Sequence, residues 1–279
     1  MFGDQTVHIM PMEFGAAGGP RQAPEDNAFR NRPTTFTRYI VGFLGRGDQI
    51  SALLPSGLAL RGDPVVEFHF LLLRDISWLA GRGYNILSML IPVRHQSATG
   101  ERVDGLYQAV LWENLADPII TGREQLGHPK LYAELPPPRT CDGATHLSAR
   151  WGDFTFAKLE LTCGSTATDD VRAQMRDRAG AGLFSHKYIP TTGRWDEADA
   201  DYLTLSPMPG GSNVIDPQPD PEIKVGTGTV TFNSPEWQDM PTQYHIIRKI
   251  AALEQRATLD AVAMSGTTYL DLFDQRIIC

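Results

Sequence analysis

The chain has 279 residues, of which 42% are hydrophobic and 21% charged, so it can bury a core and is not disordered. Its net charge of −8 argues against a nucleic-acid partner, which would favour a basic surface. The longest apolar runs are too short to span a bilayer, and no leader-like segment opens the chain. Three widely spaced cysteines indicate reduced thiols. We therefore expect a soluble, cytoplasmic protein that does not bind membranes.

Compact apolar segments bounded by glycine and proline predict most of the strands. In chain order, the predicted strands are residues 37–44, 65–73, 84–93, 106–112, 154–162, 183–189, 222–232 and 267–278. Residues 154–162 are apolar at both parities, which is typical of a central strand covered on both faces. Gly226 and Gly228 indicate a bulge or a close approach between two backbones.

Fewer segments favour helices, and they alternate with irregular stretches. Asp48 is expected to cap a short helix that ends at Leu54, before Pro55. The other predicted helices are residues 114–126, 168–179 and 241–251. The predicted irregular regions are an N-terminal arm, residues 1–35, and a loop dense in proline and glycine, residues 206–221. Strands outnumber helices, so residues 36–279 are expected to form a single β-dominated α+β domain.

Lys130 is the most informative residue of the chain, because it follows a proline and is one of only five lysines. The segment Gly122-Arg123-Glu124, followed by Pro129-Lys130, resembles the acetoacetate decarboxylase superfamily, whose lysine after the proline forms a Schiff base. Residues 54–58, 78–85, 91–93 and 184–190 also resemble family segments in the matching order. The resemblance implies a β-rich cone or barrel with outer helices, usually a homo-oligomer. It also implies a small oxo acid or ketone as substrate, and no cofactor.

Two departures from the decarboxylases bear on the reaction. Those enzymes follow the nucleophile with a second lysine, where this chain has Leu131. Without that second cation, we expect burial among apolar groups to favour the neutral amine that attacks a carbonyl. The resemblance also places His69 and Ile86 where the decarboxylases have glutamates. The expected activity is therefore that of a carbon–carbon lyase, either of the aldolase–dehydratase type or a decarboxylase.

Lys130, His69 and Tyr269 are the predicted catalytic residues. His69 is the best candidate for a general acid or base, because histidine changes its charge near neutral pH. A satisfied core histidine is an equal alternative. Tyr269 aligns loosely with a C-terminal tyrosine of the family and could donate a proton, although an ordinary strand aromatic explains it as well.

The predicted substrate-binding residues are Arg123, Glu124, His128, Tyr84, Ile86 and Arg38. Arg123 suits bidentate recognition of a carboxylate, or else forms an ion pair or a loop anchor with Glu124. Arg38, Arg82 and Arg94 are alternative clamps. His128 would share a face with Lys130 if a strand began before Pro129, and otherwise lies in a loop.

Other classes of function have little support in the sequence. The seven histidines show no close ligand spacing, and Cys-x-x-Cys is absent, so no metal site is expected. Gly226-x-Gly228 lacks the third glycine of a dinucleotide-binding loop. Lys158 and Lys187 are competing amines, each explained more simply as structural. The alternative to an enzyme is a binding or scaffold protein that keeps the fold and binds an oxo acid without turnover.

Overall fold

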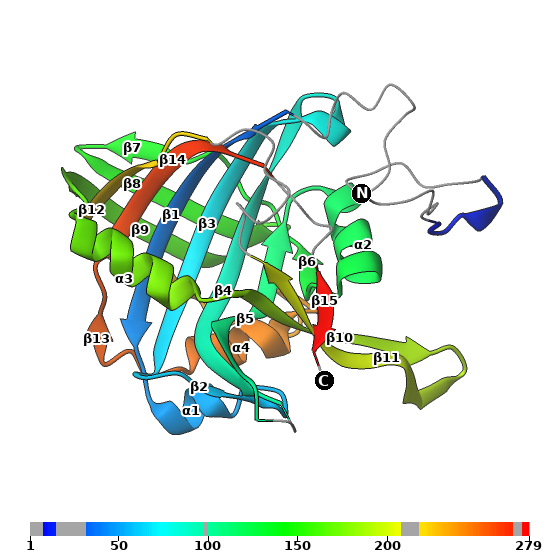
Figure 1. Ribbon diagram of the computed structural model, residues 1–279. Helices are drawn as coiled ribbons and strands as arrows, with labels where there is room; N and C mark the ends of the chain where they lie inside the picture. Colours follow the sequence, from blue (N-terminus) through cyan, green and yellow to red (C-terminus); the bar gives the residue numbers. More distant parts are fainter. Residues whose placement is uncertain (1–7, 15–31, 98–99, 208–217, 270–274, 279) are drawn as a thin grey trace.

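The computed structural model describes residues 8–14, 32–97, 100–207, 218–269 and 275–278, and its main element is one 15-stranded sheet. The strands are β1 (Thr34–Leu44), β2 (Leu58–Leu60), β3 (Val65–Ile76), β4 (Arg82–Gln96), β5 (Arg102–Glu113), β6 (Lys130–Tyr132), β7 (Arg139–Cys141), β8 (Ala144–Trp151), β9 (Phe154–Thr166), β10 (Gly182–Thr191), β11 (Arg194–Pro207), β12 (Glu222–Phe232), β13 (Ala257–Thr258), β14 (Ala261–Thr268) and β15 (Arg276–Ile278). Their order across the sheet is β15-β11-β10-β5-β4-β3-β1-β14-β12-β9-β8-β7, and β2, β6 and β13 pair with β4, β5 and β1. The predicted β-dominated α+β class is confirmed (Figure 1).

The main core lies on one face of the central strands. Successive side chains of a strand point to opposite faces, so β3 places Phe68 and Phe70 on this side. Trp112 of β5 packs against Phe156 of β9 with their ring centres 5.3 Å apart. The Trp112 Nε1 also donates a hydrogen bond to the Gln243 Oε1 at 2.8 Å. Each such buried side chain contributes roughly 1.5–3 kcal/mol through the hydrophobic effect. The residues that alternate with these core residues along each strand therefore lie on the opposite face of the sheet.

Helices cover the sheet at several places. The helices are α1 (Gly47–Ser51), α2 (Ala116–Thr121), the π-helical turn η4 (Gly122–Leu126), α3 (Asp169–Ala179) and α4 (Tyr244–Ala251), with short 3-10 turns η1 (Met12–Phe14) and η3 (Ser77–Leu79). Helix α3 crosses β14, β1 and β3 on the face opposite the main core, while α4 packs into that core (Figure 1). None of the helices in the described ranges combines the length and the apolarity needed to cross a lipid bilayer.

The predicted boundaries of the helices need correction. The N-cap of α1 is Arg46, and Asp48 lies in the first turn, where its carboxylate pairs with the Arg46 side chain instead of capping. The helix ends at Ser51, before the expected Leu54. The helix predicted over residues 114–126 is confirmed as α2 and η4, although it begins at Ala116.

Several predictions about strands are wrong in part. Residues 154–162 are not covered on both faces, because Lys158 and Glu160 of β9 are exposed while Leu159 between them is buried. The final strand predicted over residues 267–278 is two strands: β14 ends at Thr268, and β15 pairs with β11. Residues 270–274 lie outside the described ranges.

The strands that were not predicted include two long ones, β8 and β11. The polar residues of β8 are partly exposed and several of those of β11 are exposed, so both strands lack the compact apolar run on which the prediction depends. β11 includes Ser206 and Pro207 of the predicted loop, and residues 208–217 of that loop lie outside the described ranges. β1 begins at Thr34, within the predicted N-terminal arm. The division into an arm and a single domain otherwise stays a prediction.

The bulge predicted at the glycines of β12 is confirmed. β12 has the expected bounds, and its register with β9 shifts between Val225 and Gly226, which is a bulge. A Cβ added at Gly226 would lie 1.9 Å from the Thr162 carbonyl oxygen, so only glycine permits this approach of the two backbones.

Replacing Thr168 with alanine is expected to lower the free energy of unfolding by about 1 kcal/mol. Thr168 is the N-cap of α3, and its Oγ1 accepts a hydrogen bond from the Val171 amide at 3.4 Å. Thr168→Ser keeps the hydroxyl and should cost less. Urea denaturation measures both variants, and equal losses would show that the hydroxyl does not stabilise the helix.

Candidate active site

The register of the sheet places most of the candidate residues on one face, opposite the main core. Directly paired residues of neighbouring strands point to the same side of a sheet. One row across β1, β3, β4, β5 and β6 consists of Ile40, His69, Ser88, Leu111 and Lys130. The adjacent row across β1, β3, β4 and β5 consists of Arg38, Leu71, Ile86 and Glu113. A third row across β1, β3 and β4 consists of Phe36, Leu73 and Tyr84. We call these three rows the site face.

Lys130 is the first residue of β6 and is buried beside β5 and α2. Its Nζ lies 2.8 Å from the Glu113 Oε1 and donates a hydrogen bond to the Pro118 carbonyl oxygen at 2.9 Å. The two side chains of this ion pair are 8% and 1% exposed. Gly122 packs directly on the lysine, because a Cβ there would lie 2.4 Å from the Lys130 Cε and 2.6 Å from its Nζ. The burial predicted for the amine is confirmed, but a carboxylate accompanies it.

Glu113 was not predicted as a site residue. It is the last residue of β5, and its Oε2 is buried without a hydrogen-bond partner among the described residues. Burial raises the pKa of the Glu113 carboxyl, and the adjacent Lys130 opposes part of that shift. Burial also raises the pKa of Tyr84 well above its ordinary value, with a further contribution from the Glu113 charge. Glu113 is therefore a readier proton acceptor than a solvated glutamate, and Tyr84 remains a neutral phenol.

The middle row of the site face is the accessible one. Arg38, Leu71 and Ile86 are each partly exposed, whereas His69 and Tyr84 in the flanking rows are buried. The Arg38 Nε is nevertheless enclosed without a hydrogen-bond partner in the described part of the chain. Burial lowers the pKa of Arg38, and the Glu67 carboxylate opposes that shift. Because a guanidinium titrates far above neutral pH, Arg38 offers a cation with a free donor.

His69 belongs to a chain of charged and polar contacts with helix α3. Its Nε2 lies 3.0 Å from the Glu67 Oε2, and the other Glu67 oxygen binds the Arg178 Nη1. Burial lowers the pKa of His69; Glu67 opposes this, while Arg38 and Arg178 add to it. Burial alone would raise the pKa of Glu67, but His69 and Arg178 outweigh it and hold that pKa at about 2. His69 is thus a buried histidine with a specific partner.

The remaining predicted residues lie around this face. Arg123 Nη1 donates to the Lys130 carbonyl oxygen at 2.9 Å, and the Glu124 carbonyl accepts from the Lys187 Nζ at 2.6 Å. Both therefore anchor the loop before β6, and among the described residues no ion pair joins Arg123 to Glu124. His128 precedes β6 and lies with its Nδ1 3.0 Å from the Ser185 Oγ of β10. Tyr269 directly follows β14, beyond the rows of the site face.

Three residues that contact Lys130 or His69, or hold such a contact in place, were not predicted from the sequence. They are Glu113, Glu67 and Arg178. A signal existed for Glu113, since it directly follows the apolar run from Ala109 to Trp112 and pairs directly with Ile86. The resemblance placed Ile86 where decarboxylases have a glutamate, so a carboxylate occupies the neighbouring position on the same face. Arg178 lies more than 100 residues from its partner in sequence, and only tertiary structure brings the two together.

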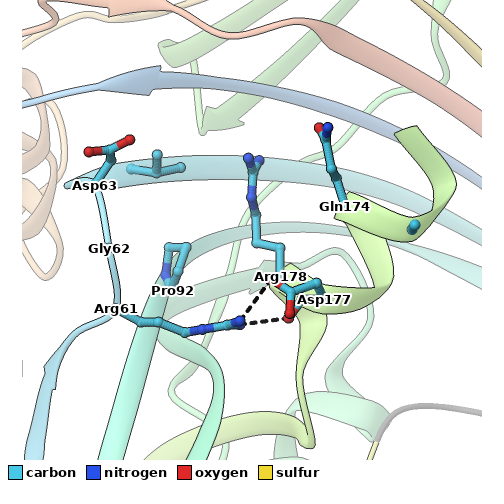
Figure 2. Close-up of a pocket in the computed structure, with 9 residues that line it drawn as sticks. Arg61, Gly62, Asp63, Pro92, Gln174, Asp177 and Arg178 are labelled. Atoms are coloured by element: carbon cyan, nitrogen blue, oxygen red, sulfur yellow. Dashed lines mark hydrogen bonds and ion pairs between the residues drawn. The ribbon is translucent and has the colours of Figure 1, made fainter. Parts of the chain in front are cut away.

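Two cavities border the site face but are not lined by Lys130. The larger, about 620 Å³, lies between α3 and the end of β3, and its lining includes Val65, Pro92 and Arg178. Figure 2 shows the Arg61 side chain bound to Asp177 across this cavity. The smaller, about 400 Å³, has Tyr84 and Tyr132 in its wall.

The Glu67 ion pairs should make stability depend on acid pH. Because the folded-state pKa of about 2 lies below the ordinary glutamate pKa of 4.5, Glu67 contributes stability above pH 4.5 that disappears as the pH falls toward 2. The pKa difference corresponds to about 3 kcal/mol. Glu67→Gln should therefore lower stability at pH 7 and flatten its pH dependence between pH 5 and 2, as measured by urea denaturation. Glu160→Gln, which changes a carboxylate whose side chain is 61% exposed, is the matched control. An unchanged slope in Glu67→Gln would contradict the assignment.

Comparisons with known proteins show the family and the fold of this chain. The acetoacetate decarboxylase family model matches residues 10–270. The chain is similar in structure to an acetoacetate decarboxylase of Legionella pneumophila, with 17% identity over 89% of this chain and 88% of that chain and a TM-score of 0.63. Another acetoacetate decarboxylase matches with 16% identity over 90% and 91% of the two chains and a TM-score of 0.66.

A third similar structure is MppR, an enduracididine biosynthesis enzyme. In complex with the condensation product of pyruvate and imidazole 4-carboxaldehyde, MppR matches with 15% identity over 99% of this chain and 98% of that chain and a TM-score of 0.62. A search of curated proteins found no match. At these identities the structures establish the fold, whereas the family model spans nearly the whole chain and includes the buried Lys130. The chain therefore belongs to the acetoacetate decarboxylase family.

Proposed function

We propose that this protein is a Schiff-base-forming carbon–carbon lyase that acts on a small oxo acid through Lys130. The observation that carries the proposal is the buried pair of Lys130 and Glu113, on the sheet face that also holds Arg38. An amine must be neutral to attack a carbonyl. Moving a proton from the Lys130 Nζ to the Glu113 carboxylate removes two buried charges at once, which a dry environment favours.

The first steps follow from this proton transfer. The neutral Nζ attacks the substrate carbonyl carbon, and the former carbonyl oxygen takes up two protons and leaves as water. The protonated imine that forms withdraws electrons from the neighbouring carbon–carbon bond. Loss of carbon dioxide or of a proton then gives an enamine, which can be protonated or can attack an aldehyde. Both a decarboxylase and an aldolase–dehydratase use this intermediate.

Arg38 is the group proposed to hold the substrate carboxylate. Its partly exposed side chain and free Nε suit an anion, and Leu71 and Ile86 lie between it and Glu113. Adjacent strands are about 4.8 Å apart, so the row from Arg38 to Glu113 spans about 14 Å between backbones. The arginine and glutamate side chains occupy much of that span, which favours a small substrate. A complex of MppR with pyruvate supports an oxo acid.

Reductive trapping tests the proposal. Borohydride treatment with pyruvate or acetoacetate should add the reduced substrate to the wild-type protein, as read by intact mass and peptide mapping to Lys130. Lys130→Met should give no adduct, whereas Lys158→Met, which removes an exposed lysine, should leave it intact. An adduct on Lys158 or Lys187 would overturn the site. No adduct across a panel of carbonyl compounds would favour the binding-protein alternative.

Two further measurements distinguish the possible reactions and test the oligomeric state. Carbon dioxide release from acetoacetate that depends on Lys130 would identify a decarboxylase, and a product from pyruvate and an aldehyde would identify aldolase chemistry. The homo-oligomer stays a prediction, which light scattering of the purified protein tests.

A further inference from the structure

We propose that His69 is the base that removes a proton from the carbon beside the imine, and that Glu67 and Arg178 are positioning residues that hold His69 for this step. The inference rests on the proposed Lys130 imine and adds the residue that generates the enamine. In this step the carbon–hydrogen bond breaks and its proton moves to the His69 Nδ1. The electron pair of that bond forms the carbon–carbon double bond, and the imine pair returns to the Lys130 nitrogen.

The positions of His69 and Lys130 on the site face support this assignment. His69 and Lys130 lie in the same row of the site face, joined through Ser88 of β4 and Leu111 of β5. Three strand spacings of about 4.8 Å separate the two backbones by about 14 Å. The two side chains point to the same side of the sheet, and in the proposed complex a small molecule attached to Lys130 extends toward His69 beside the partly exposed middle row. Arg38 is one row away and can hold the carboxylate of that molecule.

The contacts of Glu67 determine which ring nitrogen of His69 carries the proton. Glu67 accepts from Arg178 with one oxygen and lies 3.0 Å from the His69 Nε2 with the other, so both oxygens are engaged. An ionised carboxylate can only accept a hydrogen bond, which places the single proton of a neutral His69 on Nε2. The lone pair of Nδ1 is then available, and Nδ1 makes no hydrogen bond within the described part of the chain.

The charged groups around His69 also favour its role as a base. The groups that face His69 are Glu67 on its own strand, Arg38 on β1, Ser88 on β4 and Arg178 on α3. Burial and the two arginines lower the pKa of His69, while Glu67 raises it. The ring is therefore neutral near pH 7, as a base requires, and the Glu67 carboxylate can stabilise the imidazolium once the proton arrives.

Hydrogen exchange of pyruvate in heavy water separates this step from imine formation. The wild-type protein should exchange the methyl hydrogens of pyruvate, followed by NMR, and should also give the borohydride adduct on Lys130. His69→Gln retains a donor for Glu67 but has no base. It should keep the adduct and slow exchange about 100-fold or more. His146→Gln is the matched control, because His146 forms an exposed pair with Glu160 at 3.3 Å on β8 and β9.

The pH profile tests Glu67 as a positioning residue. Exchange divided by trapped adduct should fall in the wild type as acid protonates His69. Glu67→Gln should slow exchange and move that fall to lower pH, because the carboxylate that raises the pKa of His69 is gone. Glu67→Asp should restore part of the rate. A merely structural role for Glu67 would not move the profile.

Failure of the inference and failure of the proposed function give different results. No adduct with the wild-type protein contradicts the imine itself. Normal adduct with unchanged exchange in His69→Gln overturns the assignment of His69. Loss of adduct and exchange together in a folded His69→Gln protein also overturns it, since His69 would then act in imine formation. If a variant does not fold, the wild-type profile decides, because exchange per adduct that does not fall at acid pH excludes a histidine base.

Discussion

Replacing Glu113 with alanine is expected to lower the free energy of unfolding by about 3–5 kcal/mol and to abolish trapping of pyruvate on Lys130. The stability loss arises because Glu113 is 0% exposed and its partner would remain as a buried, uncompensated ammonium. Trapping is lost because the nearest proton acceptor for the amine is removed. Urea denaturation and intact mass after borohydride treatment measure the two effects separately.

A double variant is the control for this prediction. Lys130→Met combined with Glu113→Leu replaces the pair with apolar side chains of similar size, which is often neutral or stabilising. The double variant should therefore be more stable than Glu113→Ala alone. If it is no more stable, the loss in the single variant comes from a cavity and not from the unpaired charge. Glu113→Gln, which keeps the shape without a titratable group, should lose trapping with a smaller loss of stability.

Replacing Gly122 with alanine is expected to reduce the rate of adduct formation about 100-fold while the protein remains folded. Gly122 has helical backbone angles, with φ of −68° and ψ of −39°, so alanine fits the backbone. The added methyl group would, however, lie within 2.6 Å of the Lys130 Cδ, Cε and Nζ atoms. The flexible lysine can move aside, so the protein should fold with reduced stability, but its amine then leaves Glu113 and the Pro118 carbonyl.

Gly164→Ala provides the matched control, since a Cβ at this exposed glycine of β9 meets no atom within 4 Å. Time courses of borohydride trapping compare the two variants with the wild type, and thermal melting confirms that each is folded. A Gly122→Ala protein that traps pyruvate at the wild-type rate would show that the amine does not need the observed position.

The strands were predicted best where the local hydrophobic pattern agrees with the burial in the folded protein. The strands predicted from the apolar runs of β1, β3 and β4 are confirmed, and so is the family that the motif before Lys130 indicated, because each depends on neighbouring residues. β8 and β11 were missed because polar residues interrupt their apolar positions. Residues 154–162 show the opposite error, since an apolar strand can still present Lys158 and Glu160 to solvent.

The candidate site was predicted only in its outline. Lys130, His69 and Arg38 were chosen by residue type, and the register places them on one face. The partners of these residues depend on pairings between distant segments, which a single sequence does not display. Glu113 reaches Lys130 only because β5 and β6 run parallel, and Arg178 reaches Glu67 only because α3 crosses the sheet.

In the proposed reaction, the Pro118 carbonyl competes with Glu113 for the hydrogen-bond donors of the Lys130 nitrogen. The Lys130 ammonium carries three N–H groups and contacts two acceptors, the Pro118 oxygen and Glu113. A protonated imine on the same nitrogen has a single N–H, so it can satisfy only one of them. The carbonyl can never become a donor, whereas Glu113 becomes one when it takes the proton. Glu113 can return that proton to the departing water, and as a carboxylate it then lies beside the positive imine, whose single N–H can stay with Pro118.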